Sequence, residues 1–124
     1  MVKLGAIQIF VSDWQKAKQW YADVLGMEPA GDYPETQAAW MKFDGVDFYL
    51  ETPNPGWGSG WDAVSVGGRR PIIFETEDIA ATVKAMKWKG VRFVEEIAKR
   101  PWGEEVAVFA DSDGNEFNLV QSAG

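Results

Sequence analysis

The chain has 124 residues, 46% of them hydrophobic and 25% charged, which is typical of one globular domain with its own core and excludes a disordered chain. The absence of cysteine excludes disulfides, thiolate nucleophiles and cysteine metal ligands, and the absence of histidine removes the most common metal ligand and general base. Twelve basic against nineteen acidic side chains give a net charge of −7. We therefore expect no nucleic-acid partner, because phosphate neutralisation needs clustered Lys and Arg.

Membrane targeting is not expected either. No apolar run approaches the ~20 residues that cross a bilayer. No apolar signal segment precedes the first predicted strand. The sequence thus predicts a cytoplasmic protein with no membrane partner.

The first predicted elements are a strand and a helix. Residues 4–11 are rich in Ile, Val and Phe, which predicts a strand buried on both faces. Ser12 is the expected N-cap of the helix, with Gln15 completing a capping box, and Gly26 is its expected end. Apolar side chains recur between them at helical spacing, namely Trp14, Ala17, Trp20, Tyr21, Val24 and Leu25. The aromatic ones, Trp14, Trp20 and Tyr21, are expected in the core.

A hairpin is expected next. Residues 31–34 are expected to form a turn or loop, and residues 38–43 and 47–51 to form strands. Asp44-Gly45, between the two strands, is a dipeptide typical of tight hairpin turns.

Residues 53–70 read as a linker between two halves of the domain. The stretch is rich in Pro and Gly and also carries Trp57 and Trp61. The single domain, residues 1–124, would then consist of a first module over residues 1–52 and a second over residues 71–124.

The second half contains the same kinds of element. Residues 71–76 are a predicted strand and residues 78–89 a predicted helix, whose lysines lie towards the C-terminus, where the helix dipole favours them. Further strands are predicted over residues 91–95, 104–110 and 116–121.

The two halves appear as an internal repeat. Residues 10–14 and 74–79 each open an amphipathic stretch that ends at Gly. Residues 44–50 and 113–119 are also similar, with the turn, an acidic residue, Phe and Leu at the same positions in both. Equivalent positions of a repeat occupy equivalent places in space. We therefore predict an α+β fold of two tandem βαβββ modules. Because a single helix covers only one face of each sheet, the modules should form a curved mixed sheet around a concave cleft.

The repeat resembles the vicinal oxygen chelate superfamily, which includes glyoxalase I, extradiol dioxygenases, fosfomycin-resistance enzymes and bleomycin-resistance proteins. The resemblance rests on residues 9–13, 20–26 and 108–120 and covers nearly the whole chain. It implies the fold specifically and the function only loosely, since one scaffold hosts several chemistries.

The enzymes of this superfamily hold a divalent metal through one residue, usually His, from the first strand of each half and one, usually Glu, from the last strand. Carried over by spacing, the slots and their repeat partners fall on Ala6, Tyr49, Pro71 and Asn118. None is a His or a carboxylate, whereas a metal needs several converging lone pairs. We therefore expect no metal, no other cofactor and no catalytic residue, which favours a binding protein over an enzyme.

The same carry-over predicts the lining of the cleft. Because side chains alternate along a strand, further polar and aromatic residues are expected on the sheet face that carries the four metal-ligand positions. Alternation leaves open which face Trp40 takes. Tryptophans in Gly/Pro-rich loops are expected to cover the pocket or an interface. The predicted ligand-binding residues are Gln8, Phe10, Trp40, Tyr49, Glu51, Trp57, Trp61, Glu75, Trp102 and Asn118.

Three functions are compatible with such a lining. The leading hypothesis is a metal-independent protein that sequesters an aromatic or cationic small molecule, such as an antibiotic, as the bleomycin-resistance branch does. The alternative is a lyase or dioxygenase-type enzyme that uses either a divergent oxygen-ligand metal site or Glu51 or Glu75 as a base. The third is an accessory module with an empty cleft.

The resemblance also implies a homodimer, because members of the superfamily often complete their clefts between subunits. The sequence leaves open whether the two modules pair within one chain or exchange between chains.

Overall fold

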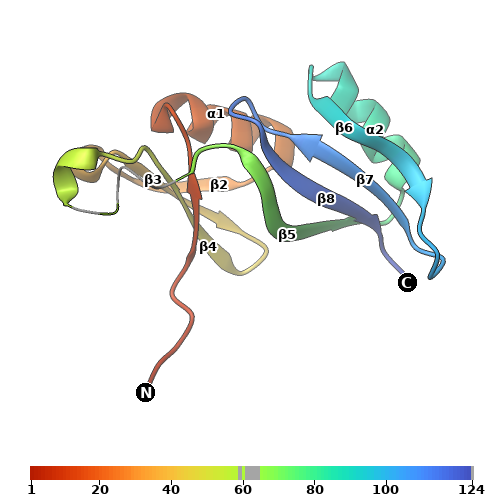
Figure 1. The fold of residues 1–124 in the computed structure, drawn as a ribbon, viewed down its shortest axis with the longest axis horizontal. Coiled ribbons are helices and arrows are strands. Elements are labelled where there is room, and N and C mark those ends of the chain that lie inside the picture. The colour runs from red at the N-terminus through yellow and green to blue at the C-terminus, as the bar shows by residue number, and fades with distance from the viewer. Residues whose placement is uncertain (59, 61–64, 124) are drawn as a thin grey trace. The chain divides into compact units, whose positions relative to one another are not determined.

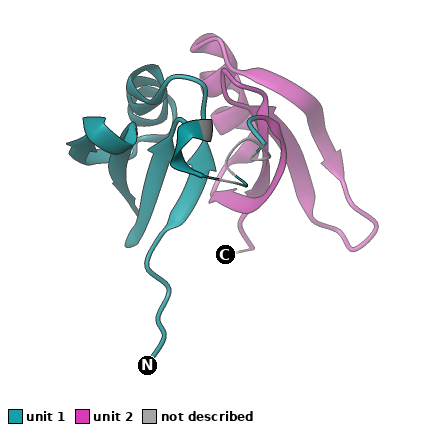
Figure 2. Ribbon diagram, turned by 60° about the vertical axis from the view of Figure 1, so that its left-hand side comes forward, with its two compact units in different colours: residues 1–66 teal, residues 67–124 magenta. Residues whose placement is uncertain are grey.

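The computed structural model describes residues 1–58, 60 and 65–123 and divides into two compact units, Met1–Val66 and Gly67–Gly124 (Figure 2). Over the described residues, each unit contains one α-helix and one four-stranded mixed sheet (Figure 1). The predicted pair of tandem βαβββ modules is therefore confirmed. No helix in these ranges is both long and apolar enough to cross a membrane.

The first unit has the strand order β1-β4-β3-β2, with β1 parallel to β4 and the other pairs antiparallel. Its elements are β1 (Ile7–Phe10), α1 (Trp14–Leu25), β2 (Glu28–Tyr33), a short 3₁₀ turn (Pro34–Thr36), β3 (Ala38–Phe43), β4 (Val46–Glu51) and a second 3₁₀ turn (Pro55–Trp57). The helix α1 packs on β2, β3 and β4.

The second unit has the corresponding order β5-β8-β7-β6, with β5 parallel to β8. Its elements are β5 (Gly68–Thr76), α2 (Ile79–Trp88), β6 (Arg92–Lys99), β7 (Glu105–Ala110) and β8 (Asn115–Gln121). The helix α2 packs on β6 and β8.

The strand order and the parallel pairing agree with the internal repeat. In the parallel pair of the first unit, Gln8 lies opposite Tyr49. In the second unit, Ile73 lies opposite Asn118. Tyr49 and Asn118 are equivalent positions of the repeat, so the two parallel pairs join equivalent strands, with a shift of register in the second pair between Arg69 and Ile73.

Helix α1 begins one residue later than predicted. Its N-cap is Asp13, whose Oδ1 accepts hydrogen bonds from the backbone N of Gln15 and of Lys16, both at 3.1 Å. The prediction of Ser12 as the cap is wrong, because the helix starts at Trp14 and the carboxylate satisfies the free N–H groups of the first turn. Helix α2 is capped in the same way by Asp78.

The end of α1 is as predicted. Gly26 takes a φ of 77°, the left-handed conformation that favours glycine, and its N–H bonds back to the carbonyl of Ala22.

The turn predicted over residues 31–34 is wrong, because Glu28–Tyr33 forms β2 and pairs with β3. Pro29 and Gly31 disfavour a strand, but β2 is an edge strand and the register shifts between these two residues. Edge strands and bulges tolerate Pro and Gly, which explains how this sequence still pairs.

Strand lengths also differ from prediction at the starts of the two halves. The first strand begins at Ile7, and Leu4 is 82% exposed, so the segment before β1 is not buried on both faces as expected. The second half begins earlier than predicted, at Gly68, whose N–H donates to the carbonyl of Gly114 at 2.9 Å.

The two predicted Asp-Gly turns are confirmed. Asp44 and Gly45 both take positive φ, 50° and 76°, as the two-residue turn between β3 and β4 requires. In the second turn the buried carboxylate of Asp111 accepts from the backbone N of Asp113 at 2.9 Å and of Asn115 at 2.8 Å. These acids therefore shape turns.

The core of the second unit is largely aromatic. The ring of Phe109 lies 5.9 Å from that of Phe74, 6.1 Å from that of Phe93 and 5.6 Å from that of Phe117. Such tilted and edge-on contacts stabilise aromatic pairs beyond simple burial. The cluster occupies the α2 side of the sheet. The opposite side carries charged groups together with the buried side chains of Val106, Val108 and Val120.

Candidate ligand-binding face

The sheet face of the first unit that lies away from α1 collects five of the predicted ligand-binding residues. On the α1 side, Ile9, Met41 and Leu50 have no exposed surface. Because side chains alternate along a strand, their neighbours point to the other side. Cross-strand pairing brings these neighbours together, and they are Gln8, Phe10, Trp40, Tyr49 and Glu51. We call this surface the open face of the first sheet.

Pairing settles the orientation of Trp40, which the sequence leaves open. Trp40 lies directly opposite Tyr49 on β4 and opposite Gly31 on β2. Its ring covers Gly31, where an added methyl group would lie 3.2 Å from Cε3 of the indole. Glycine at position 31 therefore lets the indole lie against the backbone of β2.

Two further residues on this face were missed by sequence reasoning. The ring of Tyr33 lies 6.3 Å from that of Tyr49, and Nζ of Lys42 lies 5.3 Å from the ring of Trp40. Tyr33 was missed because its segment reads as a turn. Lys42 could have been found, since it stands two residues from Trp40 and alternation puts both on one side.

The polar part of the open face is a carboxylate beside an amide. Nε2 of Gln8 donates to Oε1 of Glu51 at 3.2 Å. Burial raises the pKa of Glu51 above its ordinary value, and the hydrogen bond from Gln8 opposes part of this rise. A partly dehydrated carboxylate of this kind interacts strongly with a cation that replaces its lost water.

The equivalent face of the second sheet holds two predicted residues, Glu75 and Asn118, in a different setting. They lie on neighbouring strands, where Ile73 pairs with Asn118 and Glu75 with Val120. Glu75 is exposed. Neither side chain takes part in the ion-pair network that lies on the same face.

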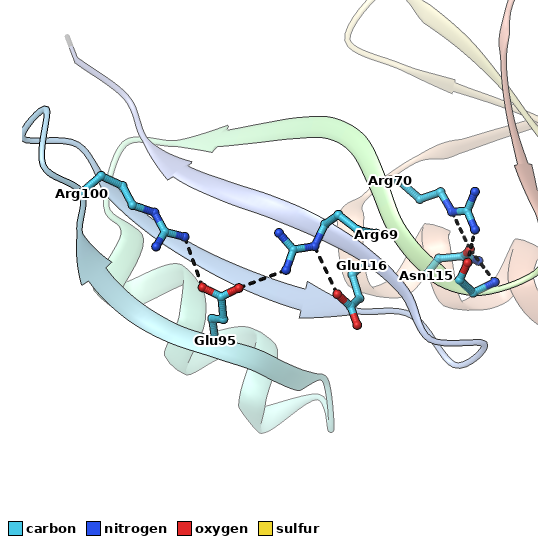
Figure 3. A network of polar contacts seen from close by, with 7 residues as sticks. Arg69, Arg70, Glu95, Arg100, Asn115 and Glu116 are labelled. Atoms are coloured by element: carbon cyan, nitrogen blue, oxygen red, sulfur yellow. Dashed lines mark hydrogen bonds and ion pairs between the residues drawn. The ribbon is translucent and has the colours of Figure 1, made fainter.

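That network is centred on Arg69 (Figure 3). Its Nε donates to Glu116 at 3.1 Å and its Nη2 to Glu95 at 3.0 Å, while Arg100 donates to the other oxygen of Glu95 at 3.3 Å. The bonds from Arg69 and then Arg100 lower the pKa of Glu95, and the bond to Glu95 raises the pKa of Arg69. Within this network, two arginines and two glutamates balance each other's charge.

The tryptophans predicted from the loops lie at separate points along the chain. Trp57 is half-buried in the 3₁₀ turn after β4. Trp102 lies in the turn between β6 and β7, is 72% exposed and donates from Nε1 to Glu104 at 3.2 Å. Trp61 lies outside the described residues.

The donor set does not fit the divalent metal that the fold family implies. Ala6 and Pro71 have no side-chain donor, and Gln8 and Glu51 bring together only one amide and one carboxylate on the open face. No group of three acidic side chains that could hold a metal occurs in the described part of the chain. Over the described ranges, the open face therefore has no complete set of ligands for a divalent metal.

Comparison with known proteins identifies relatives along the full length of the chain. A family model described as the Glyoxalase/Bleomycin resistance protein/Dioxygenase superfamily matches residues 3–119. The uncharacterized protein YetH of Bacillus subtilis (strain 168) is 34% identical over 125 residues, covering 98% of this chain and 100% of YetH.

Solved structures share the fold. A member of the Glyoxalase/bleomycin resistance protein/dioxygenase superfamily from Sphaerobacter thermophilus DSM 20745 has a TM-score of 0.79 at 30% identity, with 97% of both chains covered. TnmS3, an antibiotic binding protein from Streptomyces sp. CB03234, has a TM-score of 0.76 at 25% identity, covering 99% of this chain and 98% of TnmS3.

Proposed function

The chain belongs to the Glyoxalase/Bleomycin resistance protein/Dioxygenase superfamily, and from this membership we propose that it is a metal-independent binding protein that captures a planar, cationic small molecule. The observation that carries the proposal is the combination of aromatic rings and one carboxylate on the open face of the first sheet. Similarity to TnmS3, an antibiotic binding protein, supports capture of an antibiotic-like compound.

The aromatic side chains supply the stacking surface. Trp40 is held against β2, and the rings of Tyr33 and Tyr49 approach each other beside it. Rings fixed by strand pairing lose little conformational freedom when a planar molecule stacks on them. Aromatic faces also attract cations, with Trp the strongest, and a cationic ligand would compete with Lys42 for the ring of Trp40.

Glu51 supplies the preference for positive charge. Its carboxylate is partly dehydrated, and within the described residues its only side-chain hydrogen bond is the one from Gln8. A ligand ammonium or amidinium group would add a charge-assisted hydrogen bond, which is worth about 1.5–3 kcal/mol. A neutral compound of the same shape would bind more weakly.

Isothermal titration against a panel of planar cationic dyes and drugs, with neutral analogues of matched shape, tests the proposal. We expect saturable binding of a cationic member that persists in a chelator. Glu51→Gln should weaken it about tenfold or more, and Trp40→Ala should weaken cationic and neutral analogues alike. Absence of binding by every compound, with folded protein, would refute the proposal.

Matched controls separate the site from general effects. Glu77→Gln removes an exposed carboxylate of the second unit, and Trp88→Ala removes an exposed indole on α2. Both variants should retain the affinity of the parent protein. Quenching of intrinsic fluorescence by the bound ligand should likewise shrink in Trp40→Phe and persist in Trp88→Phe.

A second function, catalysis by Glu51 as a general base, is favoured by one observation. Burial raises the pKa of Glu51, which brings a carboxylate closer to the range used in proton abstraction. Mass spectrometry of any compound that binds would reveal a change in its mass or isotope content. An unchanged ligand after prolonged incubation favours capture, whereas turnover that disappears in Glu51→Gln favours catalysis.

A further inference from the structure

Lys42 places a cation of the protein itself at the ring on which a ligand would stack. Its Nζ lies 5.3 Å from the centre of the Trp40 ring, within the distance of about 6 Å over which an ammonium group is attracted to an aromatic face. Lys42 and Trp40 stand two residues apart on β3, and alternation puts both on the open face. The side chain of Lys42 therefore competes for the stacking surface of the indole.

Two carboxylates flank Lys42 across the sheet. Glu28 on β2 lies directly opposite Lys42, and so does Asp47 on β4. Residues directly opposite each other on antiparallel strands project to the same side, where opposite charges attract. Within the described residues, Lys42 nevertheless forms no ion pair with either of them. Its ammonium group thus has two environments close by, the indole and this acidic pair.

A surface hollow makes room for the second environment. It has a volume of about 310 Å³ and is lined by Glu28, Lys42, Phe43, Asp44, Gly45 and Asp47. The lining includes three carboxylates and a single ammonium group, that of Lys42. Because a lysine has a flexible four-carbon stem, its ammonium group can turn from the ring into the hollow without a change in the backbone.

We propose that Lys42 exchanges between these two environments and thereby determines which compounds the open face retains. When a planar ligand stacks on Trp40, the ammonium group of Lys42 leaves the ring and pairs with Glu28 and Asp47. The displaced charge is then neutralised by carboxylates and does not stay unpaired beside a cationic ligand. The inference rests on the proposed function, since it concerns the same site.

The exchange narrows the class of ligand. A ligand with a primary ammonium group would replace the contact of Lys42 with the ring by an equal contact and gain nothing there. A planar, delocalised cation such as a guanidinium or an amidinium also stacks on the indole and is more weakly hydrated than an ammonium. The site should therefore retain delocalised cations in preference to primary amines of the same shape.

Nuclear magnetic resonance of the free protein tests the contact between Lys42 and the ring. The ring current of Trp40 should shift the ε-methylene protons of Lys42 upfield, and Trp40→Ala should remove this shift. Trp88→Ala, which removes an exposed indole of α2, should leave the shift unchanged. Lys42 signals without an upfield shift in the wild type would overturn the proposal.

Titration calorimetry with three compounds of one shape tests the competition. The compounds are naphthamidine, a planar cation, naphthylmethylamine, a primary ammonium, and naphthamide, which is neutral. Lys42→Met should bind all three about two- to fivefold more tightly, as the loss of one exposed cation–π contact implies. The gain for naphthamide is decisive, because simple charge repulsion by Lys42 would affect only the two cations.

Two further variants are matched to Lys42→Met. Lys42→Arg keeps the charge but should weaken the binding of all three compounds, because a guanidinium stacks on the indole better than an ammonium does. Lys16→Met removes an exposed lysine of α1 and should bind like the wild type.

The acidic pair is tested with the neutral compound, whose affinity does not depend directly on the charge of the site. Glu28→Gln/Asp47→Asn should weaken the binding of naphthamide about two- to fivefold, because Lys42 loses the ion pairs that stabilise it away from the ring. The same double substitution should have no effect in the Lys42→Met background. An equal effect in both backgrounds would overturn the exchange.

The outcomes separate this inference from the proposed function. If naphthamidine binds but Lys42→Met leaves the affinity for naphthamide unchanged, the proposed function stands and the exchange is refuted. If naphthylmethylamine binds as tightly as naphthamidine, the ligand class is wrong. If no cationic compound binds either the wild type or Lys42→Met, the proposed function fails and the inference fails with it. Circular dichroism identifies any variant that does not fold, and Lys42→Arg, an exposed and charge-conserving change, keeps the test available in that case.

Discussion

Two side chains on the open face, Glu51 and Trp40, each hold a polar group that burial makes less stable. Glu51 is held partly dehydrated beside Gln8, so its ionised form is less stable than that of an exposed carboxylate. The indole Nε1 of Trp40 is buried and has no hydrogen-bond partner among the described residues. Such groups reduce stability, and proteins commonly retain them where binding requires them.

Ligand binding should depend on pH through Glu51. Because burial raises its pKa, protonation on acidification occurs above the ordinary value of 4.5, and the affinity for a cationic ligand should fall through that range. Titration calorimetry in a pH series should show this loss in the wild type and a flat, weaker profile in Glu51→Gln. Equal pH profiles for the two proteins would contradict the assigned role.

The same shift predicts the effect of Glu51 on folding. A raised pKa means that the folded state holds its proton more tightly than the unfolded state, so this group's contribution to stability declines as pH rises through the raised pKa. Glu51→Gln should therefore have an unfolding midpoint at neutral pH at least as high as that of the wild type. A clear loss of stability would indicate a structural role for the carboxylate.

At the scale of elements, the caps of the two helices are equivalent. Asp13 and Asp78 each accept backbone N–H groups of the first turn, so Asp13→Ala or Asp78→Ala should lower the free energy of unfolding by ~1 kcal/mol. Gln15→Ala, which keeps the backbone N–H groups of the first turn paired with Asp13, should change it much less. Urea titrations of the three variants measure the difference, and a larger effect of Gln15→Ala would contradict the assignment.

The sequence predicts elements well where one physical signal dominates. The Asp-Gly turns and Gly26 are found because tight turns and helix ends need unusual backbone angles. Strand β2 is missed because Pro29 and Gly31 carry breaker signals, whereas pairing with β3 at a sheet edge outweighs them. Local propensity cannot show where an edge strand finds its partner.

Residues of the candidate site can be predicted from the sequence where the alternation of side chains along a strand can be predicted. Gln8, Tyr49 and Glu51 follow from a repeat that fixes their phase, and the structure brings them to one face. The face taken by Trp40 needed the register of β3 against β4. The loop tryptophans Trp57 and Trp102 have no such periodicity, and their positions were not predictable.

At the scale of the whole molecule, acid stability should depend on the network of the second sheet. The pKa of Glu95 is lowered by Arg69 and Arg100, so its stabilising contribution is present above the ordinary value of 4.5 and is lost as pH falls through the lowered pKa. Glu95→Gln should lower stability at neutral pH and reduce the decline on acidification. Thermal unfolding in a pH series measures both effects.

Glu105→Gln is the matched control for this prediction. Glu105 is exposed on the neighbouring strand β7 and forms no ion pair within the described residues. The thermal stability of the Glu105→Gln variant should change with pH in the same way as that of the wild type. If the two variants behave alike, the network is not the source of the acid sensitivity.

The self-neutralised network around Arg69 also bears on how this protein can change. Glu95 and Glu116 on the second sheet are paired with arginines, so under the proposed function the preference for a cationic ligand would depend chiefly on Glu51 of the first sheet. Substitutions in the second half should therefore have little effect on the charge preference for a ligand, whereas substitutions in the first half should change it. New specificities should consequently arise by small steps in the first half, with the second half retained as a fixed scaffold.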